Sequence, residues 1–171
     1  MGMYPGGNLI KLSPTVATAA YGAADVIFDK QELKGIVPSR GGCSILHNIT
    51  MYIDAAVSAD DFALMFFDND TGIGAAANDA VSGITDDEFQ ATGLIGAITF
   101  DTGNNGFSVG NGMVICMGTQ IAAGNIKGSS MLLKAAEGKT SIWVAMISIG
   151  GSLDMDDADG MDLTFGVQYL G

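Results

Sequence analysis

The sequence predicts an all-β fold: an antiparallel β-sandwich, either plain or of the jelly-roll type, with one short helix near residues 86–91. Short apolar segments alternate with clusters of Gly, Asn and Asp along the chain, and 25 residues are glycine. This rhythm is typical of sandwiches and barrels, whose short strands are joined by tight turns. The clearest strand, 161–170, alternates apolar and polar residues, which gives it one buried and one exposed face.

The remaining strands are read from the same patterns. Segment 43–54 also alternates, and we expect Ile45, Ile49 and Met51 on its buried face together with His47. Weaker candidates are 9–12, 25–28 and 35–37. Five segments are apolar on both faces: 62–67, 94–100, 113–117, 131–136 and 142–149. Strands of that kind lie in the middle of a sheet, or have their second face covered by a partner.

The helix and the turns have local signals of their own. Thr85 and Glu88 have the spacing of a capping box, and the acids that follow Thr85 favour the positive end of a helix dipole. The dipeptides Asn105-Gly106 and Asn111-Gly112 predict turns, because Asn and Gly tolerate positive φ. Residues 137–139 separate two apolar segments by a gap of hairpin size.

The chain divides into two parts at the level of sequence. Residues 1–24, rich in Gly, Ala and Thr, are predicted to form an N-terminal arm, which either lies across a neighbouring molecule or is partly disordered. Residues 25–171 have the length of one domain with one core. The first seven residues show no basic segment followed by an apolar one, so no signal peptide is expected.

The composition indicates contacts with other subunits. Apolar residues make up 48% of the chain and charged residues 15%, below the usual share of about 25%. The longest apolar run, 142–149, is far too short to cross a membrane as a helix. A monomer covers its apolar surface only in part, so we expect a homo-oligomer, with a trimer favoured, or a docked subunit.

The charge balance excludes two classes of partner. The chain has 19 acids and 7 bases, a net charge of −12, and Arg40 is its one arginine. Nucleic-acid binding requires clustered Lys and Arg to neutralise phosphates, so no nucleic-acid partner is expected. Binding to an anionic membrane surface is disfavoured for the same reason.

The sequence predicts no catalytic residue, because the usual constellations are missing. His47 is the one histidine, and its place in a strand favours a hydrogen-bonded structural role. There is no Gly-x-Ser-x-Gly elbow and no phosphate-binding loop. Of the three glutamates, Glu88 and Glu137 occupy capping and turn positions, which leaves Glu32, and a carboxylate pair on separate strands stays open. Trp143 is interpreted as a core residue.

No cofactor and no metal site is predicted either. One His and two distant Cys cannot supply a zinc site. Calcium binds carboxylates and carbonyls in loops, and two acidic turns are candidates, 68–72 and 154–160, although neither has the EF-hand spacing. We interpret both as solvated turns. Cys43 and Cys116 lie among apolar neighbours and are interpreted as buried reduced thiols, with a disulfide as the alternative.

Several segments together resemble small virion proteins of tailed bacteriophages, notably marine ones, that decorate the capsid. The similar segments are Ser13-Pro14-Thr15, Ala20 to Phe28, Gly42 to Leu46, Ala63 to Asp68, Leu132 to Ala136, Thr140 to Ala145 and Leu163 to Val167. The resemblance implies a β-sandwich without enzymatic activity that binds the outside of the shell in the virion. Its partners would be the major capsid protein or other virion proteins. No functional residue is carried over from it.

Two other readings of the sequence remain beside this one. A β-sandwich of this size also suits a sugar- or surface-binding module, with calcium in the acidic turns. An enzyme with an unmarked carboxylate site is the third. Within the virion class, a tail or fibre role is the alternative to decoration.

Overall fold

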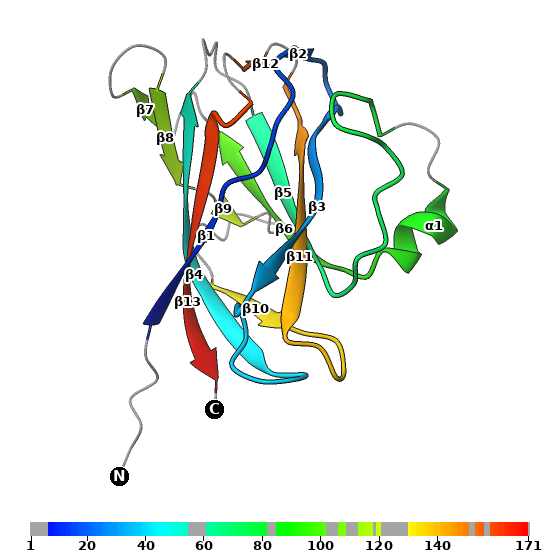
Figure 1. The fold of residues 1–171 in the computed structure, drawn as a ribbon, viewed down its shortest axis with the longest axis vertical. Coiled ribbons are helices and arrows are strands. Elements are labelled where there is room, and N and C mark those ends of the chain that lie inside the picture. The colour runs from blue at the N-terminus through cyan, green and yellow to red at the C-terminus, as the bar shows by residue number, and fades with distance from the viewer. Residues whose placement is uncertain are drawn as a thin grey trace.

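The computed structural model describes residues 7–54, 61–81, 85–101, 106–108, 113–117, 119–120, 130–150, 153–155 and 158–170. Two antiparallel sheets pack face to face, with one short helix outside them (Figure 1). The predicted all-β sandwich is therefore confirmed. The elements are β1 (Gly7–Leu12), β2 (Ala20–Tyr21), β3 (Val26–Lys34), β4 (Cys43–Asp54), β5 (Asp61–Phe67), α1 (Asp86–Ala91), β6 (Leu94–Asp101), β7 (Gly106–Ser108), β8 (Met113–Met117), β9 (Thr119–Gln120), β10 (Met131–Lys134), β11 (Ser141–Ser148), β12 (Leu153–Asp154) and β13 (Met161–Leu170).

The longer strands interleave between the two sheets. Within the described residues, one sheet has the order β1-β13-β4-β8-β7, and β10 also pairs with β4. We call it the front sheet. The other, the back sheet, has the order β3-β11-β5-β6-β9. The first and last long strands are thus neighbours in the front sheet, and each sheet takes strands from both halves of the chain.

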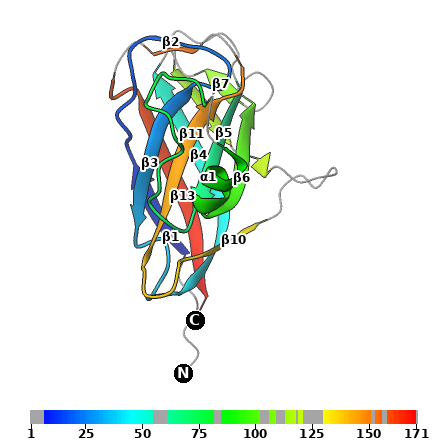
Figure 2. The ribbon, with the colours of Figure 1, turned by 90° about the vertical axis from the view of Figure 1, so that its right-hand side faces the viewer.

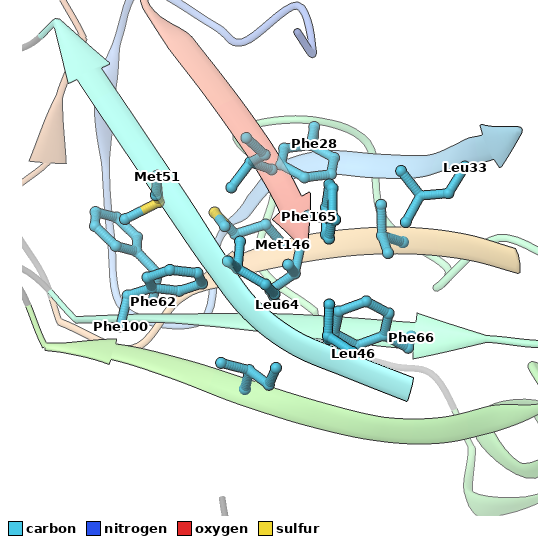
Figure 3. Close-up of a cluster of buried hydrophobic side chains, with 14 of the residues drawn as sticks. Phe28, Leu33, Leu46, Met51, Phe62, Leu64, Phe66, Phe100, Met146 and Phe165 are labelled. Carbon is cyan, nitrogen blue, oxygen red and sulfur yellow. The ribbon is translucent and has the colours of Figure 1, made fainter. Parts of the chain in front are cut away.

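The main core lies between the two sheets and is built from the inward faces predicted by alternation (Figure 3). Phe165 of β13 and Phe66 of β5 meet across it edge to face, with ring centroids 6.2 Å apart and an interplanar angle of 86°. Both side chains are fully buried. Leu163, Phe165 and Val167 are buried as the sequence predicts. Apolar burial of this kind, at about 25 cal/mol per Å², is the main force that holds sandwich sheets together.

The β4 strand contains a bulge that the sequence pattern did not reveal. Gly166 of β13 pairs with Asn48, whereas the next residue, Val167, pairs with Leu46, so that His47 is the extra residue. A bulge moves the residues before it to the other face of the sheet. Leu46 is therefore buried and His47 exposed. The expectation that Ile45 and His47 share the buried face with Ile49 is wrong for these two residues.

The central strand of the back sheet, β5, is buried on both faces, as its apolar sequence predicts. β5 lies between β11 and β6, and every β5 residue after Asp61 is buried. Its outer face is covered by residues 68–81 and 85–93 of the same chain, here called the cover segment (Figures 1 and 2). Ile73 and Phe89 of the cover segment pack there with Phe67. No partner molecule is needed to cover this face. By contrast β10 alternates, with Leu132 exposed.

The start of the chain differs from the predicted N-terminal arm. From Gly7 to Leu12 it forms β1 and pairs with β13 of the same domain. Val16 and Tyr21 are buried in the main core, and the Tyr21 hydroxyl donates to the Ala17 carbonyl at 3.1 Å. Residues 7–24 thus belong to the sandwich, because β1 completes the edge of the front sheet and Val16 and Tyr21 join the core. Residues 1–6 lie outside the described part of the chain.

One weaker strand and the predicted turns can also be compared with the structure. Residues 35–37 form no strand, and Ile36 and Val37 enter the core from a turn. The gap at 137–139 is not a hairpin, because β10 and β11 belong to different sheets. Gly106 begins β7, whereas Asn105 and the Asn111-Gly112 turn lie outside the described residues.

The predicted helix and its capping box are confirmed. Helix α1 spans Asp86–Ala91, with Thr85 as its N-cap. The Glu88 amide donates to the Thr85 hydroxyl at 3.3 Å, and the Thr85 amide donates to the Glu88 carboxylate at 2.8 Å. The hydrogen bonds that the Thr85 amide and hydroxyl donate to the Glu88 carboxylate lower the pKa of Glu88.

Candidate functional site

The structure gives His47 partners that the sequence did not suggest. On the exposed face of the front sheet, its Nε2 lies 3.0 Å from Oε1 of Gln168 and its Nδ1 lies 3.3 Å from Oγ of Ser130. In the Ser-His-Asp triad the imidazole is oriented by a carboxylate. Here the group across the ring is the neutral amide of Gln168. The arrangement is a hydrogen-bonded surface cluster, which agrees with the structural role expected for His47.

The first acidic turn, a calcium candidate, already contains a cation from the protein itself. Nζ of Lys30 donates to the carbonyls of Asn69 at 3.2 Å and Thr92 at 2.8 Å. It also lies 3.8 Å from the centroid of the Phe67 ring, a cation–π contact. The Asn69 side chain closes the turn on itself by accepting from the Thr71 amide at 3.0 Å. Lys30 thereby ties both ends of the cover segment to the back sheet.

Burial of Lys30 has a measurable consequence for pH dependence. Desolvation lowers its pKa from 10.5 to about 8, while the carboxylates of Asp29, Asp68 and Asp70 act in the opposite direction. Between about pH 8 and pH 10.5, Lys30 is more often protonated in the unfolded chain than in the folded one. The free energy of unfolding should therefore rise with pH over this range. Above pH 10 Tyr21 opposes this, because burial raises its pKa. We expect the rise in wild type and its loss in Lys30→Met, as measured by urea unfolding at several pH values. Equal pH profiles for the two proteins would contradict this role.

The described residues of the two acidic turns form no cluster of metal-binding side chains. Among the described residues, no group of three or more His, Cys, Asp or Glu side chains is arranged to hold a metal ion. In the second turn Asp154 and Asp159 are exposed, and Asp156 and Asp157 lie outside the described residues. We expect that neither calcium nor a chelator shifts the melting temperature. A calcium-dependent rise would show that a site is completed by the acidic residues of that turn.

The other residues considered from the sequence are Glu32, Trp143 and Cys43. Glu32 accepts from the Ser141 hydroxyl at 2.5 Å and forms an exposed ion pair with Lys34 at 3.5 Å. Trp143 packs against the cluster beneath the cover segment, as a core residue would. Cys43 is a free, half-buried thiol rather than a buried one.

A disulfide between the two cysteines does not fit the strand register. Cys116 pairs with Met51, eight residues along β4 from Cys43. Eight strand residues span roughly 26 Å. A disulfide requires Cα atoms within about 7 Å.

Among the described residues, no segment covers the outer face of the front sheet around β10, in contrast to the central strands of the back sheet. Ile45 lies opposite Leu132 of β10, and Cys43 lies between Lys134 and Leu170 on its two neighbouring strands. Leu132 is 55% exposed and Leu170 is 37% exposed. We call Cys43, Ile45, Leu132 and Leu170 the apolar stripe. The alternation in residues 43–54 did not predict the apolar stripe, because the β4 bulge determines which face of the sheet Ile45 occupies.

A cavity of about 630 Å³ lies next to this stripe. Its lining includes residues of β10 and of the β3–β4 and β10–β11 connections, which lie at the end of the sandwich where the chain finishes; Figure 1 shows these elements. The cavity is formed by the β3–β4 and β10–β11 connections, which are joined by two backbone hydrogen bonds. The Gly41 amide donates to the Lys139 carbonyl at 2.7 Å, and the Ala135 amide donates to the Gly42 carbonyl at 3.1 Å. Its lining is Arg40, Gly41, Asp68, Lys134, Ala135, Ala136 and Glu137.

Gly42 allows the backbone to pass close to Ser39 in the β3–β4 connection, which forms one side of this cavity. A Cβ at Gly42 would lie 2.8 Å from the Ser39 carbonyl oxygen. The Tyr169 hydroxyl, which donates to the Gly35 carbonyl at 2.6 Å, ties the same connection to β13. The lining is therefore positioned by both sheets. Its Arg40 fork and Lys134 ammonium suit a carboxylate or another small anion.

No helix among the described residues has the length and apolar character needed to cross a membrane. No family model, curated protein or solved structure matches the chain.

Proposed function

We propose that the chain is a non-enzymatic structural protein of a bacteriophage particle, which binds the outside of the capsid shell and stabilises it. The observation that carries this proposal is the difference between the two sandwich faces. The central strands of the back sheet are covered by the chain's own cover segment, whereas the front sheet exposes Leu132 and Leu170. Exposed apolar residues beside a shaped cavity are typical of an interaction surface.

The strand order gives a second, weaker support. We infer that the interleaved order, β1-β13-β4-β8 in one sheet and β3-β11-β5-β6 in the other, is that of a jelly roll. Jelly rolls occur in viral capsid proteins and in lectins. Because one fold serves many functions, this likeness supports the virion and the sugar-binding readings alike.

The charge of the protein favours the outer surface of a particle. With a net charge of −12 the chain would be repelled by packaged nucleic acid. A protein that binds the assembled shell more tightly than its free subunits stabilises the shell by linkage. We further propose that the chain acts as a small homo-oligomer, a trimer by preference, which brings several apolar stripes to the shell at once.

The proposal is tested by sedimentation of the purified protein with empty shells assembled from the capsid protein alone. We expect saturable co-sedimentation and a higher melting temperature of the shells. Leu132→Glu should weaken binding without unfolding the protein, since Leu132 is 55% exposed. Ile149→Glu is the matched control, because Ile149 is 47% exposed just after β11, away from the apolar stripe. Protein that stays in the supernatant at every concentration would contradict the proposal.

The calcium-dependent sugar-binding module is less well supported. Nζ of Lys30 donates to the Asn69 carbonyl of the turn at 68–72, and its ammonium would repel a divalent cation there. Binding on a glycan array, enhanced by calcium, would favour that alternative over the virion role.

A further inference from the structure

The charges of this acidic protein are unevenly placed along the sandwich. We call residues 32–43 and 134–141, together with Asp68, the basic end. It contains four of the seven bases and three of the nineteen acids, so its net charge is +1. The rest of the chain has three bases and sixteen acids, a net charge of −13. The four bases, all exposed, are Lys34, Arg40, Lys134 and Lys139.

The opposite end of the sandwich has the reverse character. It contains β2, β7 and β12, together with the connections next to them (Figures 1 and 2). Asp54 ends β4 there, Asp61 begins β5, and Asp154 belongs to β12. A field of this form orients the protein as it approaches a charged surface, and an acidic surface meets the basic end first.

The cations of the basic end are available to a partner. Lys34 is partly neutralised by Glu32, at 3.5 Å. For Arg40, Lys134 and Lys139, the described part of the chain offers no ion pair. Arg40 and Lys134 line opposite connections of the 630 Å³ cavity. A cavity of this size accommodates one or two side chains, and an arginine fork binds a carboxylate by two parallel hydrogen bonds.

The cavity and the apolar stripe form one continuous surface. Lys134 follows Leu132 by two residues on β10, so both side chains lie on the outer face of the front sheet. Cys43, opposite Lys134, belongs to the stripe. An incoming segment would therefore meet apolar contacts beside a cavity lined by the cations Arg40 and Lys134 and by the acids Asp68 and Glu137. Apolar residues at the centre and charged residues at the rim are the usual arrangement of a protein interface.

We propose that the basic end, with Arg40 and Lys134 at its cavity, docks onto an acidic segment of the shell protein, whose Asp or Glu carboxylate enters the cavity. This inference rests on the proposed function, and it orients the protein with its acidic end toward solvent. The polypeptide partner is favoured over a free anion because the apolar stripe adjoins the cavity.

Single charge reversals with matched controls test the proposal in the shell-sedimentation assay. Arg40→Glu and Lys134→Glu should each weaken shell binding about tenfold or more. Their thermal stability should be unchanged, since both side chains are exposed. Lys11→Glu makes the same change in net charge on β1 and should bind as wild type does. High salt should weaken wild-type binding more than that of Arg40→Glu. A carbodiimide, which joins amines to carboxylates, should link Lys134 to an Asp or Glu of the shell protein.

The possible outcomes separate the two proposals. If wild type binds shells and all three reversals behave alike, the proposed function stands and the docking surface is wrong. If wild type fails to bind, both are wrong. If Arg40→Glu reduces only the protein's own solution mass, the acidic occupant is a second copy of this chain, which overturns the shell contact. Competition by free acetate or sulfate alone, without a cross-link to the shell protein, would indicate a small-anion site and overturn it too.

Discussion

Phe165→Ala is expected to lower the free energy of unfolding by about 3–5 kcal/mol, the range of large-to-small changes in well-packed cores. Phe165 is fully buried and is the front-sheet partner in the edge-to-face contact with Phe66 of the back sheet. Its truncation removes apolar burial and that ring contact, and leaves a space that neighbouring strands cannot fill without moving.

The measurement is urea unfolding followed by circular dichroism or by the fluorescence of Trp143. Leu132→Ala is the control, because Leu132 is 55% exposed and its truncation should change stability by less than about 0.5 kcal/mol. Leu132→Ala should weaken shell binding all the same. A loss below about 1 kcal/mol for Phe165→Ala would mean that the two sheets do not pack as described.

Gly93→Ala is expected to destabilise the protein by about 2–3 kcal/mol, since it adds left-handed backbone strain and breaks a contact. Gly93 has φ +67°, and a Cβ there would lie 1.8 Å from Oδ1 of Asp68. The Asp68 side chain would have to turn away, or the backbones of Asp68 and Gly93 would have to separate and weaken the hydrogen bond from the Asp68 amide to the Gly93 carbonyl at 2.9 Å. The hydrogen bond between Asp68 and Gly93 joins the two ends of the cover segment, which leaves β5 at Asp68 and returns to β6 after Gly93.

Gly138→Ala is the control that adds the left-handed backbone strain without the steric clash. Gly138 has φ +75°, but a Cβ there would meet nothing within 4 Å. It should therefore cost only the strain of about 1–2 kcal/mol. Hydrogen exchange should show faster opening of the cover segment in Gly93→Ala and not in Gly138→Ala. Equal losses and equal exchange for the two variants would show that the approach of Gly93 to Asp68 has no structural role.

The sequence predicts those parts of the fold that depend on local patterns. The alternation in β13 and the capping box at Thr85 each determine a local structure, and the structure contains both. The apolar character of β5 on both faces correctly predicted that its second face is buried. It did not identify the cover, because the loop at Ile73 and the six-residue helix that contains Phe89 are too short to show a periodic apolar face.

Other features depend on contacts between distant segments. The bulge at His47 arises where β4 meets β13, and a Cβ at Gly166 would lie 2.1 Å from the Asn48 side chain. The β4 sequence alone reads as an unbroken alternation, which placed Ile45 on the wrong face. Arg40 and Lys134 come together only because two connections, far apart in the sequence, are hydrogen-bonded at one end of the sandwich.

The most direct test of the virion role is the amount of this chain in purified particles. Quantitative mass spectrometry of particles purified from the cells that carry its gene would give the ratio of this chain to the major capsid protein. We expect a constant ratio across preparations, with many copies per particle, and release of the chain at high salt without disruption of the shell. Particles that contain the capsid protein but none of this chain would contradict the proposed function.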